Sequence, residues 1–134
     1  MLNRNVLGEL KQWKANAKRK PLILRGARQV GKTTIVDMFA QTYKQYINLN
    51  LELQEDASPF KNYKNIRQLV EQLFFLRDKN IEKIGDTLLF IDEIQEVPEA
   101  INILRYFFEQ VPDLHVIAAG SGISYYKYFH SHCS

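Results

Sequence analysis

The sequence has few of the features that mark disulfide-stapled, membrane-spanning or strongly charged proteins. Its one cysteine, Cys133, cannot form a disulfide within the chain, so the fold must depend on its hydrophobic core and the compartment is expected to be reducing. The longest apolar runs, such as Leu88–Ile91, cover four residues, whereas about 20 are needed to cross a bilayer. No signal-peptide pattern opens the sequence. We therefore expect a cytoplasmic protein that does not span a membrane.

The excess of charge is also small. Lys and Arg number 18 against 15 Asp and Glu, and the resulting net charge of +3 is too mild to imply a polyanion as partner. The one basic cluster, Lys18 to Lys20, could contact nucleic acid or phosphate, but interleaved aromatic residues and a long basic stripe are lacking. We interpret this cluster as a solvated loop, and nucleic-acid binding is not indicated.

Strand-like apolar runs alternate along the chain with segments in which apolar residues recur at helical spacing. The expected strands cover Leu22–Leu24, Tyr46–Glu52, Thr87–Ile91 and Leu114–Ala119, and the expected helices cover residues 3–18, Thr33–Tyr43, Ile66–Phe74 and the segment from Pro98 to Val111. A polar segment around Pro59 is expected to connect two of these elements. This order predicts an α/β domain with a largely parallel sheet and right-handed crossovers. Strict alternation over Tyr46–Glu52 predicts one wet face, as on the edge of a sheet.

The turn after the first expected strand carries a phosphate-binding (Walker A) pattern. Two glycines separated by four residues are followed by a lysine and a hydroxyl residue, and the pattern stands between a strand and a helix. The expected nucleotide-binding residues are Gly26, Ala27, Arg28, Gln29, Val30, Gly31, Lys32, Thr33 and Thr34. Glycines let the backbone wrap around phosphates, on which the amide N–H groups then converge. The alternative is a coincidental glycine turn.

Three residues of this pattern have distinct expected roles. Lys32 would reach the β- and γ-phosphates as a mobile charge, and the Thr33 hydroxyl would ligate Mg²⁺. Thr34 would donate its backbone amide to the α-phosphate, and the helix that begins near Lys32 would add its positive end. The pattern therefore predicts a site for a nucleoside triphosphate.

A second motif, at the end of the third expected strand, supplies acidic residues. The apolar run Leu88–Ile91 ends in Asp92 and Glu93. A P-loop enzyme needs an acid there to hold Mg²⁺, and Asp92 fits that role. Glu93 would accept a proton from the attacking water or orient it. The alternative interpretation is that this pair caps a helix.

These two motifs together resemble those of AAA-type P-loop ATPases, in particular a bacterial and archaeal group with similar sequences at both places. The quoted stretches are RGARQVGKTT, Arg25 to Thr34, and LLFIDEIQ, Leu88 to Gln95. The resemblance implies a three-layer α/β/α fold with strand order 5-1-4-3-2 and ATP at the carboxyl ends of the strands. The strand at Ile47–Leu51 would then be the edge strand beside the strand that ends at Asp92.

The resemblance also implies a polar sensor residue at the end of the fourth strand. The candidate is Ser121, where many relatives have asparagine, and a simple turn is the alternative. Gln95 is a further candidate for assisting the site. Arg28 could touch phosphate or face solvent.

The chain departs from this family pattern at its end. Only fifteen residues follow Ala119, whereas a crossover to a fifth strand alone takes about 10 to 12 residues. An arginine finger and a helical lid have no evident counterpart, and Arg105 is a poor substitute. We expect one domain over residues 1–134, with an N-terminal helix over 3–18, a nucleotide-binding core over 21–122 and an irregular tail over 123–134. We also expect it to be the N-terminal part of a larger ATPase, or a truncated gene product, with protein partners or self-association possible through the missing region.

The predicted function is Mg²⁺-dependent ATP hydrolysis, with Glu93, Lys32 and Ser121 as catalytic residues and Thr33 and Asp92 as metal ligands. One alternative is a nucleotide-gated binding module with negligible turnover, and a weaker one is a P-loop kinase. A metal site at His130, His132 and Cys133 is disfavoured at a chain end. The aromatic residues from Tyr125 to Phe129 are interpreted as a segment without its packing partner.

Overall fold

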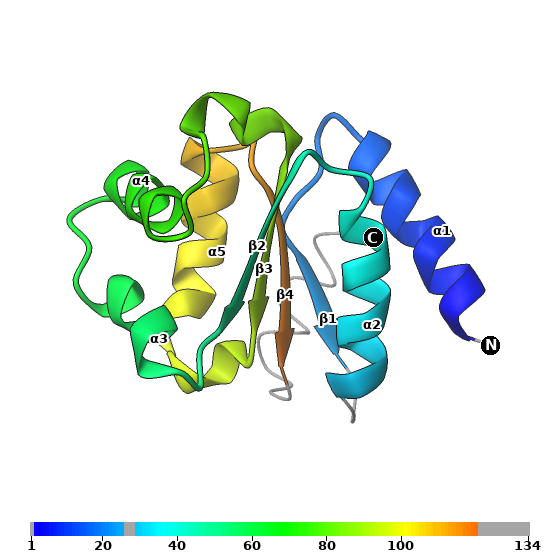
Figure 1. Cartoon of the computed structure of the whole chain (residues 1–134), viewed down its shortest axis with the longest axis horizontal. Helices are drawn as coiled ribbons and strands as arrows, with labels where there is room; N and C mark the ends of the chain where they lie inside the picture. Colours follow the sequence, from blue (N-terminus) through cyan, green and yellow to red (C-terminus); the bar gives the residue numbers. More distant parts are fainter. Residues whose placement is uncertain (1, 26–28, 121–134) are drawn as a thin grey trace.

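The protein is an α/β domain built on a four-stranded parallel sheet (Figure 1). The computed structural model describes residues 2–25 and 29–120. Its strands are β1 (Leu22–Arg25), β2 (Gln45–Asn50), β3 (Thr87–Asp92) and β4 (His115–Gly120), in the spatial order β1-β4-β3-β2. This order is the one the family resemblance implies for strands one to four. A fifth strand beside β1 is not found among the described residues.

Helices cover both faces of the sheet, which gives the three layers expected (Figure 1). One face carries α1 (Leu2–Ala15) and α2 (Gln29–Ala40). The other carries α3 (Gln54–Lys61), α4 (Ile66–Leu76) and α5 (Glu99–Gln110). Two short 3₁₀ turns, Ile81–Asp86 and Ile94–Glu96, flank β3. None of the helices within the described ranges combines the length and the apolar character that a bilayer span requires.

The central strands explain why both helical layers are needed. All six residues of β4 are buried, and β3 is buried except at Asp92. Successive side chains of a strand point to opposite faces, so Leu89 and Ile91 join the core under α3, α4 and α5, whereas Leu88 and Phe90 join the core under α1 and α2. Such uninterrupted apolar runs are typical of parallel strands covered on both sides.

The strand β2 lies at the edge of the sheet beside β3, as its alternating sequence predicts. Ile47 and Leu49 are buried, whereas Asn48 is exposed. The Leu51 N–H donates to the Asp92 carbonyl at 3.0 Å. Because backbone groups alternate in direction along a strand, the groups of Asn48 and Asn50 turn away from β3.

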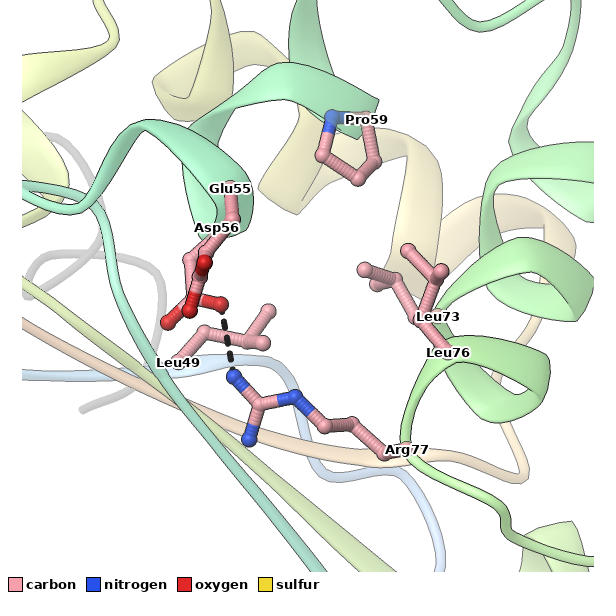
Figure 2. A pocket seen from close by; sticks show the side chains of 7 residues that line it. All are labelled: Leu49, Glu55, Asp56, Pro59, Leu73, Leu76 and Arg77. Atoms are coloured by element: carbon pink, nitrogen blue, oxygen red, sulfur yellow. Dashed lines mark hydrogen bonds and ion pairs between the residues drawn. The ribbon is translucent and has the colours of Figure 1, made fainter.

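The ion pair of Arg77 with Asp56, drawn in Figure 2, also binds two of these outward backbone groups. The Arg77 guanidinium donates to the Asn48 carbonyl at 2.7 Å, and the Asn50 N–H donates to Asp56 Oδ2 at 2.9 Å. Arg77 Nη2 and Asp56 Oδ1 form an ion pair at 2.6 Å, which links the end of α4 to α3. We call these two side chains the edge clamp. The clamp satisfies groups that an unpaired edge strand would otherwise present to another chain.

Helix boundaries differ from the predicted ones for local reasons. The helix predicted over 3–18 ends at Ala15, because the Asn16 side chain accepts from the Lys18 N–H at 2.9 Å and forms a turn. The helix expected to start near Lys32 starts at Gln29. Periodicity of apolar side chains marks only the part of this helix that packs on the core.

The segment around Pro59, expected to be a connection, contains the helix α3. It has only eight residues, and Pro59 lies inside it, where proline cannot donate a helical hydrogen bond. Burial of Ala57, Pro59 and Phe60 compensates for this weak helical propensity. Tertiary packing overrode a local signal that argued against a helix.

Candidate functional site

Parallel strands bring their carboxyl ends to one edge of the sheet, where β1 leads into the first predicted motif and β3 ends at Asp92 of the second (Figure 1). At this edge β1 ends at Arg25 and α2 begins at Gln29, while β3 ends at Asp92. The paired residues Arg25↔Gly120 and Ile91↔Ala118 show that β1, β4 and β3 end at nearly the same level. Since neighbouring strands lie about 4.8 Å apart, the ends of β1 and β3 are separated laterally by about 10 Å.

The first turn of α2 starts at this same edge. Gln29, Val30, Gly31, Lys32 and Thr33 all lie in α2, and Thr34 follows as an exposed residue of the helix. The first four N–H groups of an α-helix have no partner within the helix, and its dipole places positive potential there. An anion is therefore favoured at this position. Gly26, Ala27, Arg28 and Ser121 lie outside the described residues, so their predicted roles stay predictions.

Asp92 and Glu93 form a tight turn at the end of β3. The Glu93 N–H donates to Asp92 Oδ1 at 2.8 Å. Glu93 has φ of 55° and ψ of 47°, the left-handed conformation. Such a conformation costs a non-glycine residue about 1 kcal/mol or more and often accompanies functional sites.

Glu93 is a buried carboxylate, with only 6% of its surface exposed. The Gln95 side-chain amide donates to Glu93 Oε1 at 2.8 Å, so the partner comes from the same turn. Although Glu93 precedes the 3₁₀ turn Ile94–Glu96, its side chain makes no capping hydrogen bond. The alternative interpretation, in which the acidic pair caps a helix, therefore has no support at Glu93.

A magnesium ion would have an oxygen ligand at this edge. Asp92 is partly exposed at the end of β3, and its carboxylate is of the kind that Mg²⁺ prefers. Within the described ranges, no group of three or more His, Cys, Asp or Glu could hold a metal ion. Because Mg²⁺ in nucleotide sites takes one or two protein ligands and completes its shell with water and phosphate, the single Asp92 carboxylate fits such an ion. His130, His132 and Cys133, which the sequence analysis disfavours as metal ligands, lie outside the described residues.

Away from this edge, the structure contains a pocket that no sequence motif signals (Figure 2). It has a volume of about 240 Å³ and lies between α3 and α4 over β2. Its lining residues are Leu49, Glu55, Asp56, Pro59, Leu73, Leu76 and Arg77. The edge clamp forms part of its wall. Because Asp56 and Arg77 are 21 residues apart in sequence, no short-range pattern could pair them.

A buried polar cluster lies at the opposite, amino end of β4. His115 is 5% exposed, and its Nδ1 shares a hydrogen bond with the Tyr43 hydroxyl at 2.5 Å. Burial above all, and then the positive charges of Arg19 and Lys14, lower the pKa of His115 to about 4. Burial likewise raises the pKa of Tyr43. This cluster stays neutral at ordinary pH and stands at the far end of the sheet from Asp92, so we assign it to the core.

Comparison with known proteins adds one positive finding. A family model described as AAA domain matches residues 18–128, which is more than half of the chain. No curated protein matches the sequence. The matched domain type suggests a nucleotide-binding function of the ATPase class, in line with a parallel sheet whose strands end at an acidic turn opposite a helix N-terminus. By this match and by its fold, the chain belongs to the AAA domain family.

Proposed function

We propose that the protein binds ATP at the carboxyl edge of its sheet and hydrolyses it to ADP and phosphate with Mg²⁺ as cofactor. The observation that carries this proposal is the turn at Asp92 and Glu93, which holds a buried carboxylate in a left-handed backbone at the edge where α2 begins. Membership of the AAA domain family supports the choice of nucleotide.

Binding is assigned to the segment from Gly26 to Thr34. Its backbone amides would surround the phosphates, including the N–H groups in the first turn of α2, which the helix's own hydrogen bonds do not use. Lys32 would neutralise charge on the β- and γ-phosphates, and Thr33 and Asp92 would hold Mg²⁺. When bound, this ion supplies positive charge that stabilises the phosphates as the terminal group leaves.

Hydrolysis is assigned to Glu93. Its carboxylate would take a proton from a water molecule as the water oxygen attacks the γ-phosphorus in line with the β–γ bridging oxygen. The bond from phosphorus to that bridging oxygen breaks, and ADP leaves. Ser121 would orient the γ-phosphate from the segment after β4. A positioned general base contributes a factor of about 10² to 10⁴ in rate.

The test measures binding and turnover separately on the full chain. Isothermal titration with ATP, ADP and GTP, with and without Mg²⁺, gives affinity and base preference, and steady-state phosphate release gives turnover. Glu93→Gln should remove at least about 99% of phosphate release while ATP still binds. Glu99 is an exposed acidic residue in the first turn of α5. Glu99→Gln is therefore the matched control and should leave ATP affinity and phosphate release unchanged.

The outcomes separate the competing functions. ATP binding without phosphate release from the wild-type chain would reject hydrolysis and favour the nucleotide-gated binding module. Transfer of phosphate to an added acceptor instead of water would favour the kinase. Absence of ATP binding would reject all three.

A further inference from the structure

The turn that presents Glu93 also contains the residue that holds its side chain. Gln95 is two positions further on in the 3₁₀ turn Ile94–Glu96, and its Nε2 donates to Glu93 Oε1 at 2.8 Å. The Glu96 N–H donates to the Glu93 carbonyl at 3.0 Å, so backbone and side chain of Glu93 are both held by this turn. Gln95 itself is partly buried.

Holding a glutamate side chain has a physical consequence for any reaction in which it takes a proton. Ordering the rotamers of a free glutamate side chain costs conformational entropy, and a general base must lie within about 3 Å of the group whose proton it accepts. A hydrogen bond to one carboxylate oxygen removes much of this freedom before substrate arrives. An amide is suited to the task because it donates to an anion without adding charge.

We propose that Gln95 is a positioning residue for hydrolysis, which fixes Glu93 by its Oε1 and thereby directs Oε2 toward the attacking water. This inference rests on the proposed function, since it gives Glu93 the role of general base. The hydrogen bond acts on a group that takes part in the chemical step, so its loss lowers the rate of that step. Affinity for ATP stays the same, because the proposal assigns Gln95 no contact with the nucleotide.

The experiment compares three variants with the wild-type chain. Gln95→Met keeps the length of the side chain but removes the donor, and Gln95→Glu replaces the donor by a second carboxylate. Glu96→Gln, an exposed neighbour in the same turn, is the matched control. We measure kcat and KM for ATP by phosphate release, the ATP Kd by titration, and the fold by circular dichroism.

Gln95→Met should lower kcat by about tenfold, the loss expected for one hydrogen bond to a charged group. Gln95→Glu should lower it further, because two carboxylates at this distance repel each other. KM and the ATP Kd should stay within about twofold of wild type in both variants, and Glu96→Gln should match wild type in every quantity. A purely structural role for Gln95 would not lower kcat while leaving KM and the ATP Kd unchanged.

A second measurement keeps Gln95 in place, so it does not depend on whether the Gln95 variants fold. The side-chain NH₂ resonances of Gln95 in an NMR spectrum should move in Glu93→Gln and stay in place in Glu99→Gln. Unmoved resonances would overturn the inference, and so would full activity of Gln95→Met, an equal loss in Glu96→Gln, or a parallel loss of ATP affinity. These results would leave the proposed function standing if Glu93→Gln still abolished turnover. Absence of phosphate release from the wild-type chain would instead overturn the proposed function, and this inference with it.

Discussion

Acidification should destabilise the fold through His115. In the folded protein the pKa of this imidazole lies at about 4, whereas an unfolded histidine has a pKa of about 6.5. Between these two values the unfolded chain binds a proton that the folded chain does not. Stability therefore falls as the pH falls through this range, and it is unaffected by His115 above about pH 7.

The size of the effect follows from the difference of about 2.5 pKa units. Each unit corresponds to about 1.4 kcal/mol, so the full loss is about 3 kcal/mol, of which about 2.5 kcal/mol is reached at about pH 4.5. His115 is buried against Tyr43 and Trp13, so solvent screens this effect little. A small domain has only about 5 to 15 kcal/mol of total stability, and the loss should be plainly measurable.

Urea unfolding at several pH values between about 7.5 and 4.5 tests this prediction. His115→Gln provides the reference, because glutamine retains a polar side chain and does not titrate. Carboxylates and the other histidines titrate in both proteins and cancel in the difference between their free energies of unfolding. The advantage of wild type over the variant should shrink by about 2.5 kcal/mol from the highest to the lowest pH. A difference that stays constant would show that His115 is not held neutral by burial.

Three further predictions concern other parts of the chain. Lys32→Ala should weaken ATP binding by at least about tenfold, since about 1.4 kcal/mol of charge interaction with the phosphates is lost. The thermal unfolding temperature without nucleotide should stay near that of wild type. Unchanged ATP affinity in titration would show that this lysine does not bind the nucleotide. Asp78→Gly should raise the free energy of urea unfolding by about 1 kcal/mol. Asp78 has φ of 57° just after α4, and glycine adopts that conformation without strain. Equal or lower stability of the variant would contradict this prediction. Asp56→Ala should lower stability by about 2 kcal/mol, because it leaves Arg77 and the Asn50 N–H without this carboxylate. Hydrogen exchange at the Asn50 amide should also accelerate, and an unaltered rate would mean that the edge clamp does not protect it.

Much of the fold was predictable from the sequence because its strongest signals are periodic. The apolar run of β3 predicts burial on both faces of that strand, and the alternation in β2 predicts burial on one face. The structure confirms both predictions. The family resemblance supplied the strand order, which the structure also confirms. By contrast, α3 was missed, because its burial depends on a core that only the complete fold creates.

For the candidate site, the sequence predicted the residues but not their detailed geometry. Motif spacing predicted which residues stand at the carboxyl edge, and the structure brings the start of α2 and the turn at Asp92 to that edge. The left-handed backbone of Glu93 and its contact with Gln95 left no trace in composition or periodicity. Such details arise from one local turn, and only its geometry reveals them.

The edge clamp limits what the β2 border of the sheet can pair with. The Asn48 carbonyl and the Asn50 N–H already form hydrogen bonds with Arg77 and Asp56. A further strand could pair with β2 only after these hydrogen bonds and the ion pair were broken. The edge clamp therefore opposes pairing of a further strand with β2. Any change that separates Arg77 from Asp56 would expose backbone groups of β2 to pairing with another chain, which is a common route to aggregation.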